Sequence, residues 1–362
     1  MPLLNRRDRG AATTIVTILL AGGVLLGMTA LVVDVGRLYV EREDLQSGAD
    51  AAAMAVALDC ARRNDPARDA ECRAAAGTTS TYANSNAADG VSSYRYVCGS
   101  DSRLPTCTGA GQGNLTDCLG ERPTDVSWAE VRTRTEVPGG SLILPPVFAQ
   151  SLAGGYNGTT VEACARVGWG PPAGGFALTF SLCEYQDAVG AGDFVTGVPT
   201  AGDERVLHVH GHPDANPCNS GPSGSNLPGG FGWTDHNSSC LTTITGGTYG
   251  SDPGNGTPND CKDDLTTLID ERRPVGIPIF EYVTNNGNNG VYTLRGFAAF
   301  VVTGYRLSGM SPRDRESWLS GGTPCNGNDD CVYGYFTNAV VEWTGSFGTS
   351  SSLGATVVKT IG

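Results

Sequence analysis

Three of the four histidines in this 362-residue chain lie in the short string HVHGH. Alternate residues of a β-strand share one face, so His208, His210 and His212 could hold one metal ion, of which zinc is a common partner of imidazole. Asp214 or His236 could supply a fourth ligand. The alternative is a polar strand face in a loop-rich domain. Because the spacing fits neither H-E-x-x-H nor a metallo-β-lactamase-like motif, a metal-dependent surface hydrolase is the least favoured function.

The twelve cysteines suggest disulfide chemistry. They include no C-x-x-C pair, which argues against a zinc ribbon or a thioredoxin-like site. Outside the cytosol, an even number of scattered cysteines usually forms disulfides. Short separations along the chain favour three bonds, Cys60–Cys72, Cys218–Cys240 and Cys325–Cys331.

The last of these bonds would close the loop CNGNDDC. Its Asn and Asp oxygens are ligands that calcium accepts, but the spacing is not that of an EF-hand, so an exposed turn is favoured. The chain also has no G-x-S-x-G string and no glycine-rich loop followed by Lys-Ser/Thr. We therefore expect no enzyme and no cofactor, with zinc or calcium as the remaining possibilities.

Composition and charge narrow the class of protein further. The formal net charge is −13, which disfavours a nucleic-acid partner because phosphate binding needs a basic surface. Glycine is abundant at 51 residues and only 17% of residues are charged. These values favour loop-rich β structure over a helical bundle.

The N-terminal region predicts a membrane anchor. No charged residue occurs from Ala11 to Val33, and a helix of that length is about 35 Å long, enough to cross the hydrocarbon core. Arg6, Arg7 and Arg9 precede it, so the positive-inside rule places the N-terminus in the cytoplasm and the bulk of the chain outside the cell. A cleaved signal peptide is the alternative, but the apolar run is long and no convincing cleavage site follows it.

Beyond the span, the helical pattern continues as a stalk. A continuous helix from residue 11 to about 62 would be about 75 Å long. Its apolar stripe, with Leu38, Leu45 and Val56 as packing residues, would contact neighbouring subunits or membrane partners. Gly23 and Gly27 form a G-x-x-x-G motif that permits self-association. A turn at residues 64–66 would then start a second, antiparallel helix, as a Cys60–Cys72 bond requires.

This N-terminal segment resembles TadG-like proteins of Tad (Flp-type) pilus assembly systems. The residues that carry the resemblance are Arg-Gly-Ala before the span, ALVVDVGRLY at its exit and LQSGADAAA beyond it. Strings such as CNSGPSGSNLPGGFGW and NNGVYTLRGFAAFVVTGY are similar to the C-terminal region of actinobacterial members. The resemblance implies a pilin-like subunit without assigned chemistry.

Two features depart from patterns associated with that family. If Gly10 were a prepilin cleavage site, Ile15 would occupy the fifth mature position, where glutamate is expected, so an uncut anchor is favoured. The Asp-x-Ser-x-Ser string of a von Willebrand A domain is also missing from the sequence. We therefore expect a TadG-like type without that adhesive domain.

Alternating polar and apolar residues predict half-buried strands at 128–137 and 160–169, which together with the helices would make a small α+β, pilin-like head. From Phe176 onward, short apolar runs between Gly/Pro/Asn/Asp clusters predict a disulfide-stabilised, mostly antiparallel β sandwich or barrel, with one helix near 263–273. The expected organisation is a cytoplasmic N-terminus at 1–10, a transmembrane helix at 11–33, a stalk and α+β domain at 34–170 and an extracellular β domain at 171–362.

The favoured function is a structural, membrane-anchored accessory or minor-pilin-like component of a Tad/Flp-type pilus or surface assembly. Its expected partners are the cell membrane and other pilus subunits or further copies of itself. The main alternative is a membrane-tethered adhesin or ligand-binding module that uses the same kind of anchor.

Overall fold

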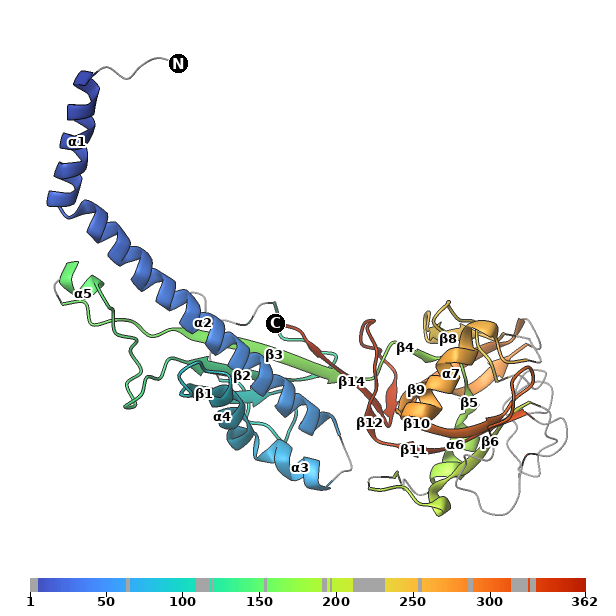
Figure 1. The fold of residues 1–362 in the computed structure, drawn as a ribbon. Coiled ribbons are helices and arrows are strands. Elements are labelled where there is room, and N and C mark those ends of the chain that lie inside the picture. Colours follow the sequence, from blue (N-terminus) through green and yellow to red (C-terminus); the bar gives the residue numbers. More distant parts are fainter. Residues whose placement is uncertain are drawn as a thin grey trace.

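The structure is a computed structural model in which a long N-terminal helical region projects from a two-domain body (Figure 1). It describes residues 6–62, 66–108, 118, 120–152, 155–190, 194–195, 197–210, 232–252, 256–285, 289–313, 325 and 330–362. The projecting region consists of helix α1 (Arg6–Ala21) and helix α2 (Val24–Ala61). The C-terminal half of α2 packs on the first domain, so one helix is shared between the projection and the body.

The first domain is built on a five-stranded sheet with the order β1-β2-β3-β14-β12 among the described strands. Neighbours from β1 to β14 are antiparallel, whereas β12 and β14 are parallel. The strand bounds are β1 Ser93–Gly99, β2 Ser127–Arg134, β3 Glu162–Gly170, β12 Ala339–Val340 and β14 Ala355–Thr360.

Three further helices belong to this domain. Helix α3 (Pro66–Arg73) begins at the proline where the sequence predicts a second helix, because proline is pre-organised for the first helical position. Helix α4 (Ala75–Ser85) follows directly and runs through Gly77. The short helix α5 (Ala149–Leu152) lies in the connection between β2 and β3.

The core between α2 and the sheet is made largely of small residues. Ala49, Ala52, Ala53 and Val56 on α2 are fully buried. They meet apolar side chains from one face of the sheet, namely Ala129, Val131, Ala165, Val167 and Trp169. Small side chains allow the helix backbone to approach the sheet closely, which is why the alanine-rich sequence of α2 suits this position.

The second domain is inserted into the first. After β3 the chain forms the second domain, and β14 then returns to pair with β3, with Val357 opposite Gly170. The expected division into residues 34–170 and 171–362 is therefore incorrect at its C-terminal end. Local periodicity could identify β14 as a strand, but it carries no information about a partner so distant in sequence.

A seven-stranded sheet forms the main layer of the second domain, with the order β5-β9-β10-β11-β6 and with β8 and β13 also paired to β10. Most of its pairs are antiparallel, so the predicted β-rich domain is confirmed. The bounds are β5 Phe180–Ser181, β6 Arg205–His210, β8 Thr248–Gly250, β9 Val275–Thr284, β10 Val291–Arg306, β11 Asp330–Thr337 and β13 Ser351–Leu353. A separate pair joins β4 (Gly174–Phe176) to β7 (Leu241–Thr243).

Two helices cover this sheet. Helix α6 (Leu182–Val189) begins within the apolar run that starts at Phe176, because Ser181 and Glu184 form a capping box. Helix α7 (Asn259–Glu271) agrees with the predicted helix but begins earlier, without a side-chain cap. A short 3-10 helix, η1 (Ala201–Asp203), precedes β6.

Aromatic side chains dominate the second core. Phe300 lies 4.9 Å from Phe336 and 6.3 Å from Phe180 between ring centroids. Tyr185 of α6 packs edge-on against Phe336 at 5.0 Å. All of these rings are buried, so the second domain depends on large interlocking side chains where the first depends on small ones.

Candidate functional site

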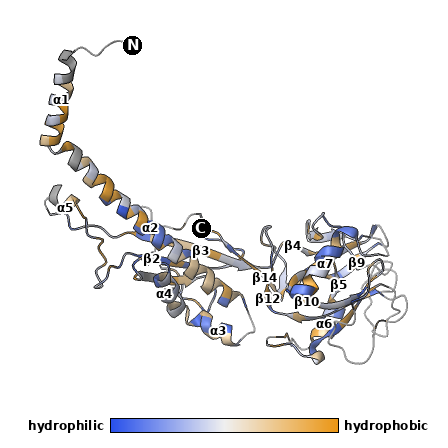
Figure 2. Cartoon of the chain, in the orientation of Figure 1, coloured by the Kyte–Doolittle hydropathy of each residue, from blue (hydrophilic) through white to orange (hydrophobic). Residues whose placement is uncertain are grey.

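Helix α1 and the first part of α2 expose large apolar side chains around their circumference (Figure 2). None of the helices in the described part of the chain is both long and apolar enough to cross a membrane. The exposed apolar residues are Ile15, Val16, Ile18, Leu19, Leu20, Val24, Met28, Leu31, Val32, Val33, Val35, Tyr39 and Val40. A surface of this kind normally marks an interaction site.

The predicted continuous helix is interrupted at Gly22 and Gly23. Gly23 has a φ angle of 67°, in the left-handed region that glycine adopts without steric cost. The uncharged run from Ala11 to Val33 is thereby divided between α1 and α2. Gly23 caps the N-terminus of α2, and its carbonyl accepts a backbone hydrogen bond of 2.7 Å from Gly27, so the two glycines are one turn apart at the start of α2. Self-association through this G-x-x-x-G motif stays a prediction.

The packing stripe of the stalk is directed at the chain's own sheet. Leu45 and Val56 are buried, and Leu38 is half-buried. Thr133 of β2 donates a hydrogen bond of 2.9 Å to the carbonyl of Leu45, which fixes the helix along the strand. Leu31 and Val35, which continue the same stripe towards the N-terminus at spacings of three and four residues, are exposed. The C-terminal part of the stripe therefore packs against the chain's own sheet, whereas the N-terminal part is not covered by any of the described residues.

A long connection between β2 and β3 lies along α2; we call residues 135–161 the arm, described except for 153–154. Its two sides are joined by a bridge in which Leu144 and Thr159 exchange backbone hydrogen bonds of 2.8 and 3.3 Å. Helix α5 lies at the far end of the arm, beside the N-terminal part of α2 (Figure 1).

Two residues of the string ALVVDVGRLY attach the arm to α2. The carboxylate of Asp34 accepts backbone hydrogen bonds from Val147, Phe148 and Ala149 at 2.7, 3.0 and 2.5 Å. The guanidinium of Arg37 donates to the carbonyl of Pro145 at 3.1 Å. Sequence reasoning missed this contact. The available signal was Asp34 itself, the first charged residue after a long apolar run.

The electrostatics at this attachment favour the charged form of the carboxylate. Burial acts to raise the pKa of Asp34, but the backbone hydrogen bonds from the arm and the nearby charge of Arg37 together hold that pKa below its ordinary value. A groove of about 720 Å³ lies between α2, the turn after α4 and the base of the arm. Glu41 lines this groove, and burial raises its pKa.

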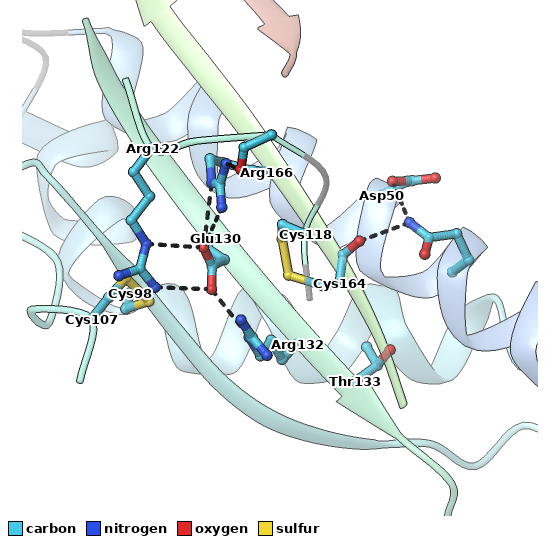
Figure 3. The surroundings of a disulfide bond; sticks show 12 residues. Asp50, Cys98, Cys107, Cys118, Arg122, Glu130, Arg132, Thr133, Cys164 and Arg166 are labelled. Atoms are coloured by element: carbon cyan, nitrogen blue, oxygen red, sulfur yellow. Dashed lines mark hydrogen bonds and ion pairs between the residues drawn. A yellow bond between two sulfur atoms is a disulfide. The ribbon is translucent and has the colours of Figure 1, made fainter. Parts of the chain in front are cut away.

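The opposite face of the first sheet holds a buried ionic cluster (Figure 3). Glu130 of β2 is fully buried and lies 3.1 Å from Arg132, 3.0 Å from Arg166 and 3.4 Å from Arg122. Burial acts to raise the pKa of Glu130, but hydrogen bonds from Arg122 and Arg166 hold it below the ordinary value. The guanidinium of Arg166 also lies over the ring of Trp128, at 5.6 Å.

The sequence predicted that the charged face of the strand at 128–137 lies in water, but in the structure this face is buried. Burial is possible because the carboxylate of Glu130 forms ion pairs with the arginines. It is also possible because the backbone at residues 120–121 accepts hydrogen bonds from Arg166. Arg166 donates to the carbonyls of Gly120 and Glu121 at 3.2 and 3.1 Å. The cluster is fully engaged within the domain, so it serves the fold.

Both domains contain disulfide bonds. Cys60–Cys72 and Cys325–Cys331 are formed as the sequence predicted, with Cα–Cα distances of 4.9 and 6.3 Å. The predicted Cys218–Cys240 bond is incorrect, because Cys240 is bonded to Cys261 of α7. Cys218 itself lies outside the described residues. The first domain also contains Cys98–Cys107 and Cys118–Cys164, which flank the ionic cluster (Figure 3).

The histidine string is only partly described. His208 lies on β6 opposite Cys331 of β11, and its side chain is half-buried. The backbone of His210 ends β6, whereas His212 and Asp214 lie outside the described residues. Zinc binding at the three histidines stays a prediction. The two groups of metal-type side chains found in the described part of the chain consist of Glu130 with cysteines that are already disulfide-bonded.

A cleft of about 490 Å³ lies where the two domains meet. It is lined on one side by Trp169 and Thr356 of the first sheet and on the other by Tyr185 and Asn338. The indole nitrogen of Trp169 is buried and has no hydrogen-bond partner among the described residues. The lining also includes Asp125, Ser127 and Ser352, so the cleft combines polar and aromatic side chains.

These features define a disulfide-bonded protein in which a projecting apolar helical region carries a small α+β domain with a β-rich domain inserted into it. Residues 10–61, which comprise almost all of α1 and α2, match the family model described as "Putative Flp pilus-assembly TadE/G-like". The helical segment is therefore similar to TadE/G-like segments, and the match supports a pilus-associated component. Comparisons with curated proteins and with solved structures found no match.

Proposed function

We propose that the chain is a membrane-anchored accessory or minor-pilin-like component of a Tad/Flp-type pilus, with a structural rather than enzymatic role. The observation that carries the proposal is the TadE/G-like segment, whose N-terminal half exposes apolar side chains on all sides. Such side chains need lipid or other apolar helices around them. Other pilus components are the partners that the family match favours.

The proposed topology is a cytoplasmic N-terminus with both domains outside the cell. It is supported by the arginines at positions 6, 7 and 9 before the uncharged run and by disulfides on both domains, because disulfides persist on the oxidising side of the membrane. The helix break at Gly23 is compatible with a membrane span, because neighbouring helices can supply hydrogen-bond partners to the backbone groups at such a break.

Three experiments test this function. Protease added to intact protoplasts is expected to remove both domains, and complete protection of the chain would contradict the proposed topology. Deletion of the gene is expected to abolish or reduce pili, and the protein is expected to copurify with pilus components. A chain that is accessible at the surface but dispensable for pili would argue for a different role of the same anchor.

The different role would be that of a tethered adhesin or ligand-binding module. The cleft between the domains favours it as the second candidate, because a concave surface of about 490 Å³ that combines aromatic and polar side chains is a suitable place to hold a ligand. An Asp125→Ala variant removes an exposed carboxylate from the wall of this cleft without touching either core. Loss of surface adhesion with normal pili in this variant would select the second function over the first.

A further inference from the structure

The position of the arm has a consequence that rests on the proposed membrane anchoring. Asp34 is the first charged residue after the uncharged run from Ala11 to Val33. If that run is in the bilayer, Asp34 lies at the boundary between hydrocarbon and water. The backbone at residues 147–149 is hydrogen-bonded to the carboxylate of Asp34, so the tip of the arm lies at the same boundary.

The composition of the arm is an independent observation. From Pro138 to Thr160 the chain contains no Asp, Glu, Lys, Arg or His over 23 residues. At the average of 17% charged residues in the whole chain, about four charged residues would be expected in a stretch of this length. Charged side chains are costly in the lipid phase, so their absence suits a segment in contact with a membrane surface.

The tip also exposes apolar and aromatic side chains. Val147 is 49% exposed and Phe148 is 46% exposed, and Ile143 and Tyr156 are exposed on the two sides of the arm. Phe148 lies next to Ala149, which begins α5, so its position relative to Asp34 is fixed by the hydrogen bonds described above. Exposed Phe and Leu side chains of interfacial segments bury at the boundary between lipid head groups and acyl chains.

We propose that the tip of the arm, centred on Val147 and Phe148, is a second membrane contact that inserts into the outer interfacial layer of the bilayer. Asp34 and Arg37 act as positioning residues for it, because their hydrogen bonds hold the tip beside the end of the span. Two contacts, the helix and the arm, fix the tilt of the first domain relative to the membrane, which a single helix cannot do.

The contact can be measured by fluorescence quenching in vesicles of brominated phosphatidylcholine that contain the full-length chain. A Phe148→Trp variant places an indole at the tip, and the matched control is Val198→Trp, since Val198 is 92% exposed and belongs to the second domain. The five native tryptophans are a common background in the parent chain and both variants. We expect F148W to show quenching above the parent and V198W to show none.

Three results would overturn the inference, and they are distinguishable. If the parent chain fails to float with the vesicles, the proposed membrane anchoring fails and the arm contact fails with it. If the parent floats but F148W is not quenched and its emission is that of an exposed indole, only the arm contact is wrong. If the emission of F148W shifts to the blue without quenching by brominated lipid, the tip is covered by protein, for instance by a second copy of the chain.

A second variant separates positioning from folding. Asp34→Ala removes the acceptor of the three arm hydrogen bonds, so in the F148W background we expect the quenching to fall towards that of the parent. Flotation and the disulfide pattern are expected to remain as in the parent, because Asp34 lies outside both domain cores. Unchanged quenching in D34A/F148W would contradict the positioning role of Asp34.

Discussion

The two domains achieve burial in opposite ways. In the first, alanines on α2 bring a helix close to a sheet whose other face holds an ionic cluster and two disulfides. In the second, large aromatic rings interlock between a wide sheet and two helices. The first core therefore tolerates almost no added volume, whereas the second is sensitive to lost volume.

The largest expected effect is in the aromatic core. Phe300→Ala leaves a cavity between Phe180 and Phe336, so we expect the free energy of unfolding to fall by about 3–5 kcal/mol in urea titrations. Tyr282→Ala, at an exposed position on the same sheet, is the control and should change stability little. Equal effects of the two variants would show that the second domain does not depend on its interlocked rings.

A comparable effect is expected at the ionic cluster. Glu130→Gln leaves the buried guanidiniums of Arg132 and Arg166 without their counter-charge, which should cost about 3 kcal/mol of unfolding free energy. Glu281→Gln, at an exposed site, should be close to neutral. A stable E130Q variant would mean that the first domain relies on α2 packing alone.

The same variant has a pH signature. The pKa of Glu130 is lowered in the folded protein, so its stabilising contribution is complete above its ordinary pKa of about 4.5 and is lost as pH falls below that value towards the lower folded-state pKa. Acid titrations of stability should therefore show a steeper loss below about pH 4.5 in the parent than in E130Q. Parallel curves would contradict the assignment.

A smaller effect is expected from added volume on α2. Ala53→Leu inserts a larger side chain between the helix and the sheet, so we expect a loss of about 1–3 kcal/mol of unfolding free energy. Ala55→Leu makes the same change two residues away, at a partly exposed position, and should be tolerated. If the two leucine variants were equally stable, the close approach of α2 to the sheet would not be required.

The smallest effect separates two glycines of α2. A Cβ at Gly48 would lie 3.1 Å from the carbonyl oxygen of Ala83 in α4, whereas a Cβ at Gly36 would meet nothing within 4 Å. Gly36→Ala should therefore raise stability by up to about 1 kcal/mol through helix propensity, and Gly48→Ala should gain less or lose. Thermal unfolding of the two variants against the parent makes the comparison, and a larger gain at Gly48 would contradict it.

Several elements of the structure followed directly from local sequence patterns. The apolar stripe predicted a packing face with Leu45 and Val56, although that face meets the chain's own sheet and not the neighbouring subunits or membrane partners that were expected. Pro66 marked the start of α3, and the short separation of Cys60 and Cys72 indicated their bond. Each of these depends on neighbours within a few turns of the chain. The alternation at 128–137 likewise predicted β2, although its polar face is buried.

The features that sequence reasoning missed depend on partners far away in the chain. The arginine-rich face of β2 is buried only because Arg166 of β3 and the segment at Gly120 cover it. Asp34 has partners more than a hundred residues later, and Cys240 is bonded to a helix that periodicity does not connect with it. The break at Gly23 was also missed, since an isolated glycine is compatible with either a continuous or an interrupted helix.

The return of β14 to β3 has a consequence for the order in which the protein forms during synthesis. The edge of β3 stays without its β14 partner until roughly 190 further residues have been made, and an open strand edge is prone to incorrect pairing. The inserted domain brings the two ends of its own chain together when it folds, which shortens the search of β14 for β3. We therefore expect the part made later to fold first, and the sheet that carries the N-terminal helix to be the last part of the molecule completed.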